Sequence, residues 1–141
     1  MSVLYVLGDA DQIRRKVEGL LLADDLRGLK MFSAAITENI NRIAGLARDM
    51  MGAEIIFCGG DDILFLVQRD RFREVEVKDW MQSFLRQTGN NISFGVGSTA
   101  EEAFLNLARA KATGFGLFIS VDRIVSEAAN TSLKRTPDGA A

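Results

Sequence analysis

The chain has 141 residues, of which 48% are hydrophobic, and its formal net charge is −2 at pH 7. This length fits one compact domain, and the charge argues against stable, sequence-independent nucleic-acid binding, which needs a clustered Lys/Arg surface. The chain contains no histidine, so His-based triads and His-bearing zinc sites are excluded, and any catalysis must use carboxylates or lysine.

The first three expected elements are one strand and two helices. Val3–Leu7 is an apolar run typical of a strand, and apolar residues from Ile13 to Leu21 then repeat at helical spacing. Arg27-Gly28 interrupts this pattern. Apolar residues from Phe32 to Met50 then predict a long amphipathic helix with one apolar stripe, which ends near Gly52.

The remaining elements again alternate between strands and helices. In chain order we expect strands at Glu54–Cys58 and Ile63–Val67, a helix with apolar residues from Val77 to Leu85 that ends at Gly89-Asn90-Asn91, a strand at Ile92–Val96, a helix from a Thr99–Glu102 capping box to about Thr113, and a last strand at Phe115–Val121. Polar residues 130–141 predict a frayed tail, which leaves residues 1–129 as the domain.

This order, β-α-α-β-β-α-β-α-β, predicts an α+β fold with a ferredoxin-like β-α-β-β-α-β core, an extra helix early and an extra helix and strand late. We expect a central sheet that contains antiparallel pairs, with the helices on one face. In that topology the first strand lies beside the two hairpin strands, so a side chain that ends the first strand approaches the hairpin turn.

Gly59-Gly60-Asp61-Asp62 lies between the two hairpin strands. A tight turn alone would explain the glycines, because glycine tolerates positive φ. Adjacent aspartates entering a strand repel each other, and a divalent cation shared with a third carboxylate makes them tolerable. Asp9, two residues after the end of the first strand, can supply that carboxylate, and we expect the three to be parts of a two-metal nucleotidyl-transfer site. Since neighbouring strand residues point to opposite faces, we expect Asp61 to matter more than Asp62.

Three blocks of sequence carry a family resemblance: the strand followed by GDAD and a helix, FCGGDDILF, and ISFGVG with the later LARAKATGFGLF. They resemble the palm domains of GGDEF diguanylate cyclases and of the polymerase subunit of type III CRISPR complexes. In particular they are similar to the stand-alone minimal CRISPR polymerase (mCpol) family, over about residues 3 to 121.

The resemblance implies a set of site residues. It implies that Asp9, the Ala10 carbonyl and Asp61, assisted by Asp62, hold two Mg²⁺ or Mn²⁺ ions, and that Lys111 contacts a triphosphate. The implied nucleotide-binding residues are Gly8, Ala10, Asp11, Ser33, Gly59, Gly60 and Lys111. The family's association with antiviral signalling implies a cyclic oligonucleotide messenger that a separate effector protein reads.

Two departures from the GGDEF pattern bear on the base. GTP-using GGDEF enzymes carry Asn-Asp and a further Asp, which bond the guanine edge, where this chain has Val17-Glu18 and Leu26. An apolar Val17 cannot make that bond, and Asp62 replaces the Glu of GGDEF. Both differences favour ATP and a cyclic di-AMP-like product. Because closing a ring of two nucleotides needs two facing sites and the chain has one cluster, we expect a homodimer or higher homo-oligomer.

Each residue of this site also has a structural explanation. Asp9 with Gln12 could form a helix N-cap, Lys111 could complement a helix dipole, and Ser33 could be an exposed helix serine. The basic run Arg14-Arg15-Lys16 either attracts phosphates or forms a solvated helix face. Two other functions therefore stay open: a palm domain that senses a nucleotide without turnover, and a plain ferredoxin-like interaction module.

The remaining expectation concerns location. The lone Cys58 excludes an internal disulfide and suits a reducing compartment. No apolar run approaches the ~20 residues that span a bilayer, so we expect a cytoplasmic protein without membrane insertion.

Overall fold

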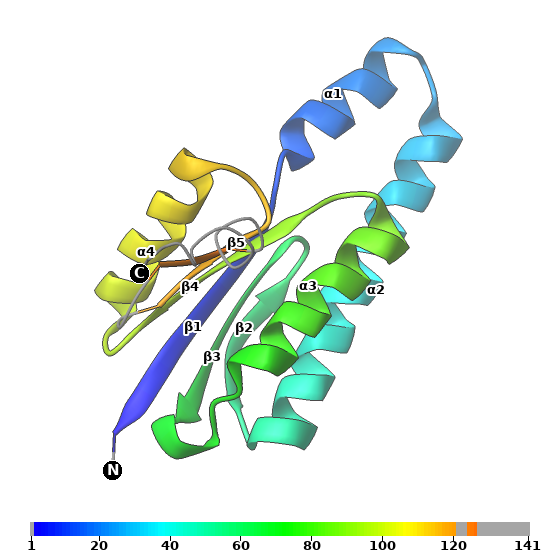
Figure 1. Cartoon of the computed structure of the whole chain (residues 1–141). Helices are drawn as coiled ribbons and strands as arrows, with labels where there is room; N and C mark the ends of the chain where they lie inside the picture. Colours follow the sequence, from blue (N-terminus) through cyan, green and yellow to red (C-terminus); the bar gives the residue numbers. More distant parts are fainter. Residues whose placement is uncertain (1, 121–123, 127–141) are drawn as a thin grey trace.

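A computed structural model describes residues 2–120 and 124–126 of the chain (Figure 1). Its elements in chain order are β1 (Val3–Ala10), α1 (Ile13–Leu22), α2 (Leu26–Met51), β2 (Glu54–Gly59), β3 (Asp62–Gln68), a 3-10 turn (Arg69–Arg71), α3 (Glu74–Thr88), β4 (Ile92–Gly97), α4 (Ala100–Thr113), β5 (Leu117–Ile119) and β6 (Ile124–Ser126). The predicted order of strands and helices is confirmed from β1 to β5. The expected tail from residue 130 lies outside the described residues.

The strands form one mixed sheet in the order β2-β3-β1-β4-β5-β6. All neighbouring strands are antiparallel except β4 and β5, which are parallel because α4 carries the chain back along the sheet between them. The expected α+β, ferredoxin-like palm fold is thus confirmed. β1 lies in the centre, between β3 and β4, so residues at its end can meet side chains from both neighbours.

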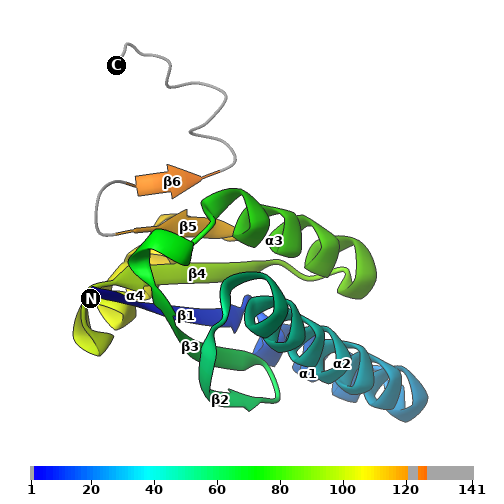
Figure 2. The ribbon, with the colours of Figure 1, turned by 90° about the horizontal axis from the view of Figure 1, so that it is seen from below.

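The helices cover both faces of the sheet, which corrects the expectation that they lie on one (Figure 2). Phe94 of β4 belongs to the hydrophobic core between the sheet and helices α2 and α3. Ile40 of α2 and Phe84 of α3 are part of the same core. The residue after Phe94, Gly95, faces α4 instead, because side chains alternate along a strand. A Cβ at Gly95 would overlap the backbone of α4 at Leu107, so this glycine allows the helix to lie directly on the strand.

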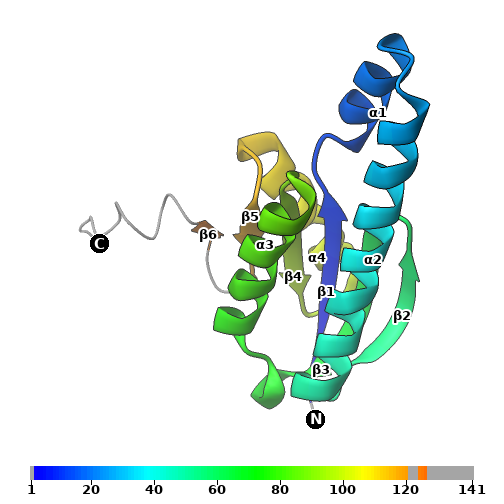
Figure 3. The same cartoon turned by 90° about the vertical axis from the view of Figure 1, so that its right-hand side faces the viewer.

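The break between the first two helices lies at residues 23–25, before the predicted Arg27-Gly28. Asp25 is the N-cap of α2, and its carboxylate accepts a 2.8 Å hydrogen bond from the Gly28 nitrogen. Gly28 is inside the helix, where a Cβ would overlap the Asp25 side chain. Both α1 and the start of α2 project beyond the ends of the strands (Figures 1 and 3).

One predicted helix cap is confirmed and one alternative is wrong. The Thr99 hydroxyl accepts a 3.1 Å hydrogen bond from the Glu102 nitrogen at the start of α4. Asp9, in contrast, is no N-cap for α1, since it lies inside β1, and Gln12 occupies the cap position without a side-chain hydrogen bond. Another explanation is therefore needed for the Asp9 carboxylate.

None of the helices in the described ranges is both long and apolar enough to cross a bilayer.

The contact between α4 and β4 predicts the effect of one substitution. Gly95→Ala should destabilise the protein by about 1–3 kcal/mol, because the new methyl group overlaps backbone that cannot move independently of α4. Gly45→Ala is the matched control. Its Cβ would meet nothing within 4 Å in the middle of α2, so it should stabilise by up to about 1 kcal/mol. Urea unfolding of both variants measures the difference, and equal stabilities would contradict this packing.

Candidate active site

Three carboxylates meet at one end of the sheet. Asp9 lies near the end of β1, Asp61 in the β2–β3 turn and Asp62 at the start of β3. One oxygen atom from each of these side chains lies within 4.8 Å of the others. The cluster that the sequence predicted is therefore present.

Strand pairing and turn geometry bring the carboxylates together. Asp62 is directly opposite Asp9 in the β1–β3 register. The two-residue turn Gly60-Asp61 has φ +58° at Gly60, which glycine adopts readily, and the Asp61 carbonyl accepts a 2.9 Å hydrogen bond from the Ala10 nitrogen. Because Asp61 belongs to the turn, the alternation of a strand does not separate it from Asp62. Both reach Asp9, so the expected preference for Asp61 is not seen in the geometry.

The cluster is electrostatically unfavourable without a counter-charge. Burial raises the pKa of Asp9. The charge and hydrogen bond of Lys111 lower this pKa, and the neighbouring charges of Asp61 and Asp62 raise it further. Burial, followed by the charge of Asp61, also raises the pKa of Asp62. Carboxylate oxygens grouped in this way, with the Ala10 carbonyl beside them, are ligands of the kind that Mg²⁺ and Mn²⁺ prefer. The residues present therefore fit a divalent metal site.

Lys111 provides positive charge beside the cluster. Its ammonium nitrogen lies 3.3 Å from Asp9 Oδ2, 3.3 Å from the Ala10 carbonyl oxygen and 2.6 Å from Asp11 Oδ1. The side chain thus reaches from the last turn of α4 to the end of β1, where its contacts are two carboxylates and a strand carbonyl. Lys111 therefore lies beside the carboxylate cluster, and its predicted contact with a triphosphate stays a prediction.

Asp11 is buried and holds Lys111 in place. Its carboxylate accepts hydrogen bonds from Ser93 Oγ at 2.8 and 3.0 Å and from the Gly116 nitrogen at 2.8 Å, besides the ion pair with Lys111. Sequence reasoning missed Ser93 and Gly116. Ser93 had one visible signal, since it is the single polar side chain in the strand ISFGVG. Every oxygen of Asp11 is already used within the protein, so its carboxylate has a positioning role.

An apolar cavity of about 160 Å³ adjoins the turn. α1 contributes Ile13 and Val17, α2 contributes Phe32, Ser33, Ile36 and Thr37, and the turn contributes Gly60 and Asp61. The structure thus places Gly60 and the exposed residue Ser33 in the lining of one cavity together with a clustered carboxylate, Asp61. It also adds a second hydroxyl, Thr37, which lies one helical turn after Ser33 on the same face and was not predicted.

Two predicted glycines lie outside this cavity. Gly8 is buried within the sheet, where a Cβ would overlap the ring of Phe94, so packing explains its lack of a side chain. Gly59 is the last residue of β2 and pairs with Asp62, closing the turn. The structure therefore gives Gly8 and Gly59 roles in building the site.

Comparisons with known proteins match this chain to one family and to a set of structures. The family described as mCpol, minimal CRISPR polymerase domain, matches residues 5–121. A search of curated proteins finds no significant match.

Among solved structures, the Csm1-Csm4 cassette in complex with cA4 is similar with a TM-score of 0.68 at 16% identity, over 84% of this chain and 21% of that chain. This chain thus spans about one fifth of that relative. An EAL/GGDEF domain protein from M. capsulatus has a TM-score of 0.58 at 18% identity, over 84% of both chains. The guanylyl cyclase Cya2 has a TM-score of 0.58 at 13% identity, over 84% of this chain and 74% of that chain. These likenesses show a shared palm fold.

The raised pKa values predict how stability depends on pH. Because folding favours the protonated form of Asp62, its contribution to stability is greatest below the ordinary carboxyl pKa of about 3.9 and falls as the pH rises through the raised pKa. In EDTA, Asp62→Asn should therefore match the parent protein at low pH and exceed it near neutrality, by less than about 1 kcal/mol.

Thermal unfolding across pH measures this difference. Added Mg²⁺ should stabilise the parent protein and have little effect on the variant. A variant that is less stable than the parent at neutral pH in EDTA would show that the carboxylates do not repel each other.

Proposed function

The chain belongs to the minimal CRISPR polymerase (mCpol) family, and from this we propose that it is a nucleotidyl cyclase that joins ATP molecules into a cyclic di-AMP-like oligonucleotide. One observation carries the proposal: the cluster of Asp9, Asp61 and Asp62 lies beside a cavity lined by the same hairpin turn. A ribose hydroxyl would attack an α-phosphate, forming a new P–O bond while the bond to the leaving pyrophosphate breaks. The same step repeated on the second nucleotide closes the ring.

The three carboxylates and the Ala10 carbonyl would hold two Mg²⁺ or Mn²⁺ ions. When bound, such ions activate the attacking hydroxyl and neutralise the charge of the leaving pyrophosphate. The chain has no histidine that could act as a general base instead. The protein's own part is to fix the carboxylates through the paired ends of β1 and β3. Strand pairing sets these positions before any ligand binds, which lowers the cost of assembling the site.

Lys111 would assist at the triphosphate. An ammonium group has three donors, and in this structure they are directed to Asp9, Ala10 and Asp11. The contact with Asp11 is the shortest and is buried, so we expect it to persist when nucleotide binds. The donors now directed to Asp9 and Ala10 would then face the phosphates.

The cavity beside the turn would hold the base and ribose. Its wall of Ile13, Val17 and Ile36 offers apolar contact to a purine, and the hydroxyls of Ser33 and Thr37 offer polar contacts. Adenine is favoured because Val17 cannot bond a guanine edge. Relatives of this fold were solved as the Csm1-Csm4 cassette in complex with cA4, pppApA and AMPPNP, which supports adenine nucleotides as the ligands of this chain. In keeping with the family, the product would serve as an antiviral messenger read by a separate effector protein.

The first test of this proposal concerns the carboxylates. Asp61→Asn should reduce product formation by roughly a hundredfold or more, because it removes a charged metal ligand at little steric cost. Asp70→Asn, in the exposed 3-10 turn that follows β3, removes the same charge away from the cluster and should keep full activity. Mass spectrometry of the products measures both. Undiminished synthesis by Asp61→Asn would remove this residue from the metal site.

The second test concerns Lys111. Lys111→Ala should weaken ATP binding much more than AMP binding, since only the triphosphate presents charge there. Arg109→Ala, a cation on the same helix, should leave the ratio of the two affinities unchanged. The ratio is the decisive quantity, because loss of the Asp11 partner will lower the melting temperature in any case. An unchanged ratio in Lys111→Ala would assign the lysine a structural role alone.

The third test concerns assembly. We propose that the active species is a homodimer or higher homo-oligomer in which two clusters face each other, so that neither nucleotide has to leave before ring closure. Specific activity should then rise with enzyme concentration and reach a plateau as dimers saturate. Constant specific activity from nanomolar to micromolar enzyme, with a monomeric mass in ATP and Mg²⁺, would instead indicate sequential synthesis in one cleft.

A further inference from the structure

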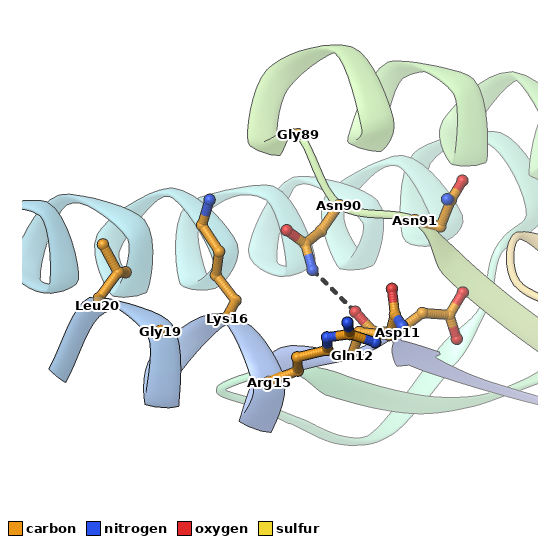
Figure 4. A pocket seen from close by; sticks show the side chains of 9 residues that line it. All are labelled: Asp11, Gln12, Arg15, Lys16, Gly19, Leu20, Gly89, Asn90 and Asn91. Carbon is orange, nitrogen blue, oxygen red and sulfur yellow. Dashed lines mark hydrogen bonds between the residues drawn. The ribbon is translucent and has the colours of Figure 1, made fainter. Parts of the chain in front are cut away.

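A second and larger cavity lies along α1, facing the loop Gly89–Asn91 that connects α3 to β4 (Figure 4). Its volume is about 430 Å³, within the range that accepts a small ligand. It is distinct from the active site, since neither the three clustered carboxylates nor Lys111 line it. Ile13 and Val17 of α1, which line the smaller cavity, do not line this one either.

The lining of this cavity is polar and carries positive charge. Arg15 and Lys16 supply two cations, and the amide side chains of Gln12, Asn90 and Asn91 supply further hydrogen-bonding groups. Lys16 and Asn90 both line the space between α1 and the loop (Figure 4), and the Lys16 ammonium also lies 5.8 Å from the centre of the Phe32 ring of α2.

The charge of this cavity is not balanced by its lining. Arg15 forms no ion pair with any residue that the structure describes. The single acidic residue of the lining, Asp11, is buried and already neutralised by Lys111. A guanidinium, an ammonium and amide groups around one space are complementary to phosphate oxygens.

Glycines keep two walls of the cavity open. A Cβ at Gly19 or at Gly89 would meet nothing within 4 Å. Gly89 has φ +75°, which explains a glycine there without reference to a ligand. Gly19 is different, because it lies inside α1, where glycine is unfavourable and where packing does not require it. Its effect is to leave room in the cavity.

We propose that this cavity is a second ligand site, which binds a phosphate group through Arg15, Lys16 and Asn90. The phosphate can belong to free phosphate or pyrophosphate, or to the phosphodiester of a nucleotide. A ligand here would touch the residues that fix Asp11. Asn90 Nδ2 donates a 2.8 Å hydrogen bond to the Asp11 carbonyl, and the Asp11 nitrogen donates a 2.8 Å hydrogen bond to the Asn91 carbonyl. A phosphate bound in this cavity would therefore affect Asp11, the residue that positions Lys111.

Backbone NMR of the full chain in EDTA, at constant ionic strength, tests this site without turnover and without metal at the carboxylates. The probes are inorganic phosphate, pyrophosphate and cyclic di-AMP, each titrated separately. We expect saturable shifts at the amides of Gly19 and residues 89–91. Arg15→Ala/Lys16→Ala should weaken binding about tenfold or more. The matched pair Arg14→Ala/Arg27→Ala removes the same charge from exposed positions outside the lining and should change affinity less than twofold.

Gly19→Leu provides a variant that should fold well, because it adds a helix-favouring side chain in open space and fills the cavity. It should abolish the shifts at residues 89–91. Binding of phosphate or pyrophosphate would identify a free anion as the ligand, and binding of cyclic di-AMP alone would identify a nucleotide. The proposal is overturned if no probe gives a saturable shift, if both charge pairs weaken binding equally, or if Gly19→Leu binds normally. These outcomes do not depend on whether the chain makes a cyclic nucleotide.

Discussion

The crowding of three partly buried carboxylates is the constraint on which the rest of this site depends. Antiparallel pairing of β1 with β3 places Asp9 opposite Asp62, and the turn adds Asp61, so that their oxygens lie within 4.8 Å. Burial and mutual charge raise the pKa of Asp9 and Asp62, which shows that folding works against full ionisation. Such a cluster does not stabilise the fold by itself, which supports the proposal that these carboxylates bind a cation.

The surrounding structure compensates for this repulsion with one lysine and holds that lysine with one buried aspartate. Lys111 comes from α4, which packs closely on the sheet because Gly95 and Gly97 of β4 have no side chains where the helix backbone lies. Asp11 then ties the lysine to Ser93 of β4 and to Gly116, which precedes β5. The packing of one helix thus positions a charged group beside the cluster. Loosening this packing would affect both stability and the proposed chemistry.

The sequence predicted the elements and the carboxylates well, because both depend on local patterns. Strand alternation, helical periodicity and the Gly59–Asp62 turn need no knowledge of distant contacts. The failures involve contacts between distant segments. The sequence did not reveal that α4 lies on the second face, since Gly95 fits a strand bend as well as a helix contact. It did not reveal the partners of Asp11 or the cavity beside Arg15, since the contacts involved join residues 79 to 105 positions apart in the chain.

The proposed function requires that this palm domain turns over ATP and does more than bind it. The most direct measurement is mass spectrometry after incubation of the protein with each of the four nucleoside triphosphates and Mg²⁺ or Mn²⁺. We expect a cyclic adenine oligonucleotide and pyrophosphate from ATP, with little product from the other three nucleotides. ATP binding without any product, with either metal and at micromolar protein, would show that the protein does not turn over ATP and would indicate a nucleotide sensor.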